Sequence, residues 1–259
     1  MRRVLLALGC AVLCACPEKK APAPIPRAQP QPLEPLEQVV QRVDGGVVTD
    51  AGKDERDALY EIVPFTPVGP PRPANAAVLK LVGDSMPAIP EGQAPVLLEA
   101  GEDEYLAQVA DLLAALDDAH REVWLAHPDA PIAFKLTLRD AARFQEWIDE
   151  PVPGKLRVIQ RADGFELKTN LGKLPGGDPN GPTVPLRGGQ LDLTTLQRGF
   201  QKIQAKFKSA PDVCFVPSFG TTLHSIARAM SVDYVRPDAP FFEQLCLIYP
   251  RAGAVDAGR

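Results

Sequence analysis

The chain has little that would mark it as a membrane-spanning, nucleic-acid-binding or metal-binding protein. Its 259 residues contain no apolar run near the ~20 residues that a membrane-spanning helix needs. Lys and Arg do not outnumber Asp and Glu, and the net charge of −5 disfavours nucleic acid as a partner. The three histidines, His120, His127 and His224, have no metal-ligand spacing with each other or with nearby Cys or carboxylates. The sequence therefore predicts no metal and no other cofactor.

Proline is the residue type in excess, with 28 in the chain. Many fall between residues 17 and 75, in runs such as residues 21–26 and 70–73. A run such as residues 21–26 cannot pair its backbone as helix or sheet, and it favours an extended polyproline chain. At ~3 Å per residue, about fifty residues would span on the order of 150 Å when fully extended. We therefore expect residues 16–75 to be a tether.

The first residues have the parts of an export signal. Arg2 and Arg3 form a basic start, and Val4 to Leu13 form an apolar stretch of about ten residues, the length of a signal-peptide core. The sequence Leu-Cys-Ala-Cys that ends at Cys16 resembles a bacterial lipobox, in which the last Cys is acylated before cleavage. The alternatives are an ordinary secretory signal with incidental cysteines and a poorer lipobox that ends at Cys10.

This resemblance implies a lipoprotein. Residues 1–15 would be the signal peptide, and Cys16 would carry a diacylglycerol and an amide-linked acyl chain such as palmitate, which together form a stable membrane anchor. Pro17 stands where Asp marks inner-membrane retention in many bacteria. We therefore expect an outer-membrane lipoprotein that faces the periplasm of a bacterial cell envelope.

Two later stretches have the pattern of one strand–helix–strand unit. The strand, helix and strand of the first unit are expected at residues 95–100, 102–120 and 122–126. Those of the second unit are expected at residues 212–216, 218–231 and 242–248. Alignment of the units sets Leu97 against Cys214 and Trp124 against Cys246. Duplication and chance recurrence of a common unit both stay open, and in either case the strands of each unit should run parallel.

A hairpin is expected ahead of the second unit. Residues 155–161 and 164–169 have strand patterns, and the Asp-Gly pair between them is a strong hairpin signal. A polar loop rich in Gly and Pro follows over residues 172–189. Asp192 is then the expected N-cap of a helix that runs to about Lys208.

The second half of the chain resembles a known family. Its order of strand, strand, helix, strand, helix, strand, and the sequences DGFELKTN, LDLTTLQRGFQKIQAKFKSAPDVCFVPSFGTTLHSIARAMS and FEQLCLIYP, are similar to the periplasmic domain of the ExbD/TolR biopolymer-transport family. Residues 95–128 resemble the last third of such a domain. The resemblance divides the chain into a partial repeat over residues 76–130, an ExbD/TolR-like domain over residues 131–250 and a disordered tail over residues 251–259. The expected fold is α/β (α+β), with small mixed sheets and helices mainly on one face.

The resemblance also limits the function. Family members that work with a proton channel have an N-terminal membrane helix with an essential Asp, and no such helix is found here, so proton-channel activity is not implied. The resemblance implies protein association, as a homodimer or with envelope proteins, or contact with peptidoglycan. The sequence therefore predicts a non-enzymatic envelope lipoprotein. A small-ligand binder also stays open, and a large apolar pocket at the junction of the two units would favour it.

Cys214 and Cys246 are the two cysteines outside the signal region. An even pair in an oxidising compartment favours a disulfide. Both are expected in the middle of strands, and adjacent parallel strands would bring their Cα atoms to about 5 Å, within the bridging range. The alternative is two buried thiols on separated strands.

An enzyme is the second class of function that the sequence allows. Residues 82–92 resemble the nucleophile segment of self-cleaving Ser/Lys proteases related to the LexA repressor, and also the first block of GDS lipases. In the hydrolase hypothesis Ser85 is the nucleophile, and Lys135 is the base that loses its proton in an apolar pocket. The late Asp-x-x-His pair of the lipases is missing, and Gly-Asp-Ser is also ordinary turn chemistry.

Overall fold

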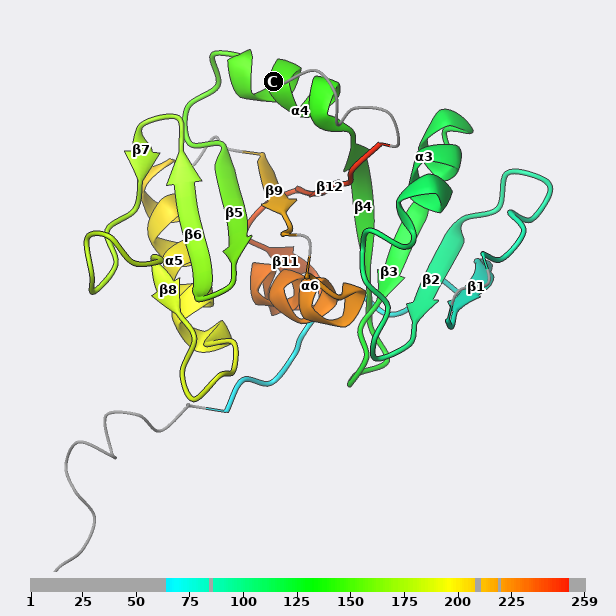
Figure 1. The fold of residues 1–259 in the computed structure, drawn as a ribbon, viewed down its shortest axis with the longest axis horizontal. Helices are drawn as coiled ribbons and strands as arrows, with labels where there is room; N and C mark the ends of the chain where they lie inside the picture. The colour runs from blue at the N-terminus through cyan, green and yellow to red at the C-terminus, as the bar shows by residue number, and fades with distance from the viewer. Residues whose placement is uncertain (1–63, 84–85, 208–210, 219, 252–259) are drawn as a thin grey trace, which may run out of the picture. The chain divides into compact units, whose positions relative to one another are not determined.

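The computed structural model describes residues 64–83, 86–207, 211–218 and 220–251 (Figure 1). The strands are Ala77–Leu81 (β1), Val96–Ala100 (β2), Val123–Ala126 (β3), Ala133–Arg139 (β4), Leu156–Arg161 (β5), Gly164–Thr169 (β6), Gly172–Lys173 (β7), Val184–Pro185 (β8), Asp212–Val216 (β9), Tyr234–Arg236 (β10), Ala239–Pro240 (β11) and Gln244–Ile248 (β12). The helices are Ala110–Asp118 (α3), Ala141–Asp149 (α4), Leu193–Lys206 (α5), Leu223–Met230 (α6) and the 3-10 helix Ser231–Asp233 (η1).

Some predictions fall outside these residues. They are the signal peptide, the acylated Cys16, most of the tether, Ser85 and the tail after residue 251. In the described part of the chain, no helix has both the length and the apolar character needed to cross a bilayer.

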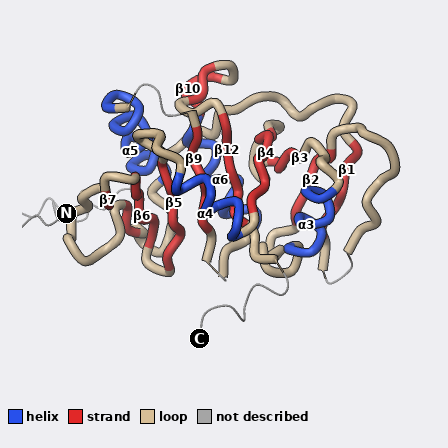
Figure 2. Tube along the Cα trace, turned by 90° about the horizontal axis from the view of Figure 1, so that it is seen from above, coloured by secondary structure: helices blue, strands red, loops and turns tan. Residues whose placement is uncertain are grey.

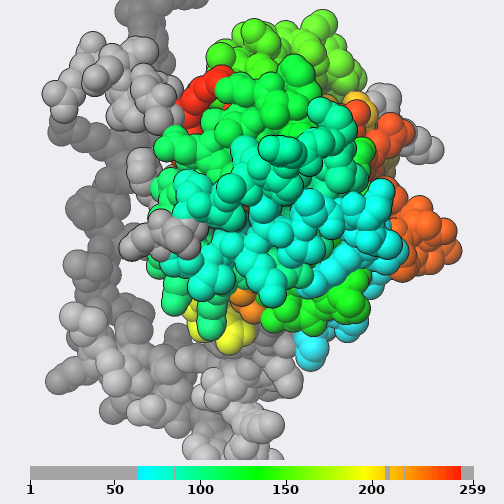
Figure 3. Space-filling view, turned by 90° about the vertical axis from the view of Figure 1, so that its right-hand side faces the viewer, coloured from blue at the N-terminus to red at the C-terminus, as the bar shows by residue number. Residues whose placement is uncertain are grey.

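Ten strands form one mixed sheet in the order β1-β2-β3-β4-β12-β9-β5-β6-β7, with β8 paired to β6 (Figure 2). The strands β10 and β11 form a separate ribbon. The α/β class predicted from the sequence is confirmed. One continuous sheet crosses the expected boundary at residue 130, because β3 and β4 on its two sides pair antiparallel. Seen from the β1 end, most of the coloured surface is cyan to green, the colours of the chain from residue 64 through β4, with orange residues at one edge (Figure 3).

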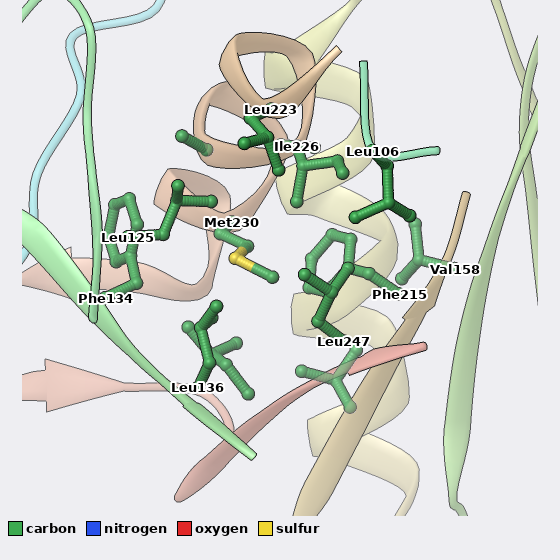
Figure 4. Close-up of a cluster of buried hydrophobic side chains, with 14 of the residues drawn as sticks. Leu106, Leu125, Phe134, Leu136, Val158, Phe215, Leu223, Ile226, Met230 and Leu247 are labelled. Carbon is green, nitrogen blue, oxygen red and sulfur yellow. The ribbon is translucent and has the colours of Figure 1, made fainter. Parts of the chain in front are cut away.

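Three helices lie on one face of the sheet. α3, α5 and α6 share one apolar core with the inward side chains of the strands. Met230 of α6 points into this core, among Leu136, Phe215 and Leu247 (Figure 4). α4 lies on the opposite face, where Trp147 packs in a separate cluster. After β4 the chain passes over β12 and β9 to reach β5, whereas the later connections from β5 to β9 and from β9 to β12 run along the sheet in the opposite direction. Because crossovers between parallel strands are right-handed, this reversal of direction places α4 on the other face of the sheet.

The strand order is the same on both sides of β4. Reading outward from β4, the sheet has β3, β2 and β1 on one side and β12, β9 and β5 on the other. Each set of three is parallel within itself. The register also matches, because Leu97 lies beside Trp124 and Cys214 lies beside Cys246. The parallel pairing expected in each strand–helix–strand unit is therefore confirmed.

The helix expected over residues 102–120 is wrong at its start, since α3 begins only at Ala110. The backbone before it is used elsewhere. The Leu106 N–H donates to the Thr221 carbonyl at 3.0 Å, and the Leu223 N–H donates to the Glu104 carbonyl at 2.9 Å. The helix expected over residues 218–231 is likewise shorter, and begins at Leu223 after the N-cap Thr222.

The elements ahead of β9 match the predictions more closely. β5 and β6 form the expected hairpin, in which Arg161 pairs with Gly164. The two-residue turn is therefore Ala162-Asp163, one residue earlier than the Asp-Gly pair suggested. Asp192 caps α5 as predicted, and its side chain accepts a hydrogen bond from the Thr195 N–H at 2.9 Å.

Candidate ligand-binding pocket

A cavity of about 790 Å³ opens at the carboxyl ends of β5 and β9, and we call it the β5–β9 cavity. Its floor and walls come from four segments: the end of β5, the loop after β9, the start of α6 and the loop that leads into α5. The ends of parallel strands and the amino end of a helix both present backbone groups that are not used in regular pairing. This is the position at which open α/β sheets commonly bind ligands.

The loop between β9 and α6 is held by its own hydroxyl groups. The Thr221 side chain is fully buried, and its Oγ1 accepts a hydrogen bond from the Ser218 N–H at 3.0 Å. Thr222 caps α6 by accepting from the Ser225 N–H at 3.2 Å. Gln160 of β5 donates to Ser225 Oγ at 3.2 Å, which joins the strand to the helix. These contacts fix the start of α6 against the cavity.

Two arginines are the charged residues that line the cavity. Arg228 makes a two-point ion pair with Asp129, at 2.7 and 3.2 Å. This hydrogen bond lowers the pKa of the Asp129 carboxyl and raises the pKa of Arg228. Arg161 pairs with Asp163 at 3.1 Å and with Glu166 at 3.3 Å. Both guanidinium groups are therefore held in place by acidic residues that do not line the cavity.

The hydroxyl groups at the cavity have structural partners rather than a base. Ser218 Oγ lies 3.2 Å from Thr221 Oγ1. The nearby His224 ring is hydrogen-bonded through Nε2 to the Ala100 carbonyl at 2.9 Å. Among the described residues, no group of three or more His, Cys, Asp or Glu could hold a metal ion. The geometry suits binding through hydrogen bonds and charge.

A second cavity lies at the junction of the two strand–helix–strand units. It is mainly apolar and lies between Leu106 and Ala107 on one side and Pro217 and Tyr249 on the other. Its volume of about 210 Å³ is below the ~300–1,000 Å³ that is typical of ligand pockets. The large junction pocket that would mark a small-ligand binder is therefore not found in the described residues.

Lys135 does not lie in the apolar pocket that the hydrolase hypothesis requires. Its side chain on β4 is 61% exposed, and its Nζ lies 2.6 Å from Glu122 Oε2. The hydrogen bond from Lys135 is the main cause of a lowered pKa at Glu122. A lysine base needs desolvation in an apolar pocket, and this exposed, ion-paired side chain does not have that environment. Two strands, β2 and β3, separate β4 from β1, which ends shortly before Ser85.

Cys214 and Cys246 lie opposite each other on β9 and β12, with their Cα atoms 4.3 Å apart and a disulfide between them. Both are buried beneath Trp147 of α4, in a cluster on the face opposite the main core. The Trp147 Nε1–H donates to Asp212 Oδ2 at 2.9 Å, which ties α4 to β9.

Sequence reasoning missed the β5–β9 cavity. The loop over residues 172–189 was expected only as a loop, yet the residues just after it form one wall of the cavity. The available signal was the group of small polar residues Ser218, Gly220, Thr221 and Thr222 at the start of the helix predicted over residues 218–231, a pattern typical of helix ends that bind anions. Comparisons with protein-family models, curated sequences and solved structures give no match to this chain.

Proposed function

We propose that this chain is a lipid-anchored, non-enzymatic binding protein of the bacterial cell envelope that mediates protein association or cell-wall contact through the β5–β9 cavity. The observation that carries the proposal is the cavity itself, a pocket of mixed polar and apolar lining with two fixed arginines and hydroxyl groups used in structural bonds. The lipobox-like sequence at Cys16 and the proline-rich segment behind it support a tethered domain.

The element order supports the relationship to ExbD/TolR periplasmic domains as a further part of the proposal. β5, β6, α5, β9, α6 and β12 follow one another in the order from which the resemblance was drawn, with only short strands, η1 and the β10–β11 ribbon added. No proton-channel activity is proposed, because the resemblance extends only to the soluble domain.

We also propose that the two strand–helix–strand units arose by duplication. The alignment of Leu97 with Cys214 continues through the following loop and helix. Between residues 105 and 113 of the first unit the buried side chains are Leu106, Val109, Ala110, Leu112 and Leu113. In the second unit, the same offset gives the buried side chains Leu223, Ile226, Ala227, Ala229 and Met230.

The test is a photo-crosslinking amino acid at Gln190, which lines the cavity, in the intact lipoprotein in bacterial cells. A matched control carries it at Lys202, an exposed residue of α5 that does not line the cavity. Cosedimentation of the detergent-solubilised full chain with purified peptidoglycan forms the second arm. A discrete crosslinked protein from Gln190 alone supports protein association, and pelleting that Gln190→Trp weakens supports cell-wall contact. The proposal is overturned if Gln190 gives no discrete crosslink beyond that of Lys202 and if Gln190→Trp does not weaken pelleting with peptidoglycan.

A further inference from the structure

The first unit contains a smaller cavity at the place equivalent to the β5–β9 cavity. This β1–β2 cavity has a volume of about 170 Å³ and is lined by Leu81, Gly83, Glu104 and Gln108, among others. Val78 of β1 lies beside Leu97, and Arg157 of β5 lies beside Cys214. Because Leu97 is aligned with Cys214, Val78 corresponds to Arg157, and the end of β1 corresponds to the end of β5.

The same register gives the counterparts of the lining residues. Leu81 and Gly83 correspond to Gln160 and Ala162, and the Leu97–Cys214 alignment sets Gln108 against Ser225. All three counterparts line the β5–β9 cavity. The two cavities therefore occupy one position in the two units.

In the first unit the chain supplies a carboxylate to this position. Glu104 is buried, with 6% of its surface exposed, and its Oε1 accepts a hydrogen bond from the Gly83 N–H at 2.5 Å. Its counterpart in the second unit is Thr221, which has no carboxylate and whose buried Oγ1 accepts a hydrogen bond from the Ser218 N–H. The second unit therefore has no carboxylate of its own at this position.

The residues around this position are also more positively charged in the second unit than in the first. Arg161 stands at the counterpart of Val82, and Arg228 stands at the counterpart of Asp111. The ion pairs described above use two nitrogens of each guanidinium, Nε and one terminal nitrogen, and a guanidinium carries five N–H donors. Where the first unit has an internal carboxylate, the second unit therefore has two arginines whose remaining N–H donors can bind one.

We infer that the β5–β9 cavity binds its ligand through a carboxylate, at the place that Glu104 fills in the first unit. The inference rests on the proposed binding function and names the ligand class. The cavity has room for more than the carboxylate, because its lining also includes Leu186, Leu191 and Leu193 and the side chains of Gln160 and Gln190. A short acidic peptide presents a carboxylate, amide groups and small apolar side chains together. It is the ligand class that this lining fits.

The test uses two peptide probes that differ in one group, N-acetyl-Ala-Glu-Ala-amide and N-acetyl-Ala-Gln-Ala-amide, titrated calorimetrically into the detergent-solubilised full chain. We expect the Glu probe to bind at least tenfold more tightly than the Gln probe. Arg228→Gln should weaken the Glu probe about tenfold and remove most of the preference. The matched control is Arg236→Gln, because Arg236 is an exposed arginine of the β10–β11 ribbon whose ion pair does not involve the cavity.

A second variant tests the position directly. Thr221→Glu would give the second unit its own carboxylate, and we expect it to abolish binding of the Glu probe while the protein stays folded by circular dichroism. If that variant does not fold, the comparison of Arg228→Gln with Arg236→Gln still decides. Equal affinity for the two probes, no binding of the Glu probe at millimolar concentration, or equal effects of the two arginine variants would overturn the inference. Gln190 crosslinking or peptidoglycan pelleting that persists in that case would leave the binding function standing without the carboxylate.

Discussion

Tyr105 and Thr222 form an antiparallel backbone bridge, and they are the residues that the alignment of the two units sets against each other. The bridge is reciprocal, because the chain around each residue donates one hydrogen bond and accepts one. An antiparallel bridge has a local two-fold axis, and this one relates two residues that the alignment pairs. The two units therefore meet through the same segment of each, directly ahead of the residues that line the two equivalent cavities.

The apolar residues next to this bridge should contribute equally to stability. Leu106 and Leu223 are equivalent, 3% and 1% exposed, and both lie in the main core. We expect Leu106→Ala and Leu223→Ala each to lower the free energy of unfolding by about 2–5 kcal/mol, measured by urea denaturation. The exposed Val235→Ala should change it by less than about 0.5 kcal/mol. Losses that differ by more than about 1 kcal/mol between the two leucines would contradict the equal contribution.

The elements that could be predicted from the sequence are those whose local signal agrees with their tertiary role. The runs that form β2, β9 and β12 are apolar because both faces of the central sheet are covered there. Asp192 caps α5 through its own side chain, so its signal is local. The hairpin of β5 and β6 follows from its turn and its alternating strands.

The remaining elements depend on contacts that no local pattern contains. Residues 104–106 have a helical pattern, but their backbone pairs with the loop before α6. That loop lies 117 residues later in the chain, the same spacing as between Leu97 and Cys214. α4 was not predicted because Trp147 is its one fully buried side chain, and that side chain is buried against the distant cysteine pair. The β5–β9 cavity was missed because its walls come from segments that only the sheet order brings together.

The disulfide gives a prediction of its own. Cys214 and Cys246 are 32 residues apart, and a loop of this length corresponds to roughly 3–4 kcal/mol in the chain-entropy model. We expect Cys214→Ala/Cys246→Ala to lower the free energy of unfolding by about that amount in urea, and to make it insensitive to reductant. The unchanged protein should lose a similar amount when unfolded in reductant. If Cys214 and Cys246 both react with a thiol label in denaturant without reductant, the disulfide does not form.

The lipid anchor can be tested by the choice of cysteine. In cells fed an alkyne fatty acid, the full chain should be labelled and should sediment with membranes. Cys16→Ser should lose the label and leave the membrane fraction, because the acylated thiol is absent. Cys10→Ser removes the thiol of the poorer lipobox and should change neither result. Loss of the fatty-acid label in Cys10→Ser but not in Cys16→Ser would show that the acylated residue is Cys10 and would contradict the assignment.

Asp233 should destabilise the fold at neutral pH. It is fully buried, one oxygen accepts from the Phe242 N–H at 3.1 Å, and Oδ2 has no partner in the described structure. Burial raises the pKa of this carboxyl well above its ordinary value. The free energy of unfolding therefore falls as the pH rises above the pKa that the carboxyl has in the unfolded chain, near 3.8. We expect Asp233→Asn to increase the free energy of unfolding at pH 7 by about 1 kcal/mol, with the gain vanishing toward pH 4. The exposed Asp238→Asn should show no such gain, and a loss at pH 7 for Asp233→Asn would contradict the assignment.

His127 should make the protein less stable in mild acid. Only 2% of it is exposed, its Nδ1 accepts from the Asp129 N–H at 3.1 Å, and its Nε2 has no hydrogen-bond partner in the part of the chain that the structure describes. Burial lowers the pKa of the ring, and this outweighs the nearby Asp129 carboxylate, which acts in the opposite direction. The unfolded chain therefore takes up the proton first, and stability is lost as the pH falls below about 6.5 toward the lower pKa of the folded state.

The variant that isolates this effect is His127→Asn, whose side-chain oxygen can accept the same hydrogen bond from Asp129 without titrating. Between pH 7 and pH 5, the unchanged protein should lose on the order of 1 kcal/mol more unfolding free energy than His127→Asn, measured by urea denaturation at each pH. The exposed His120→Asn, at a left-handed position with φ of 50° that Asn tolerates, serves as the matched control and should keep the full acid-dependent loss. Parallel pH profiles for the unchanged protein and His127→Asn would show that this histidine does not set the acid response.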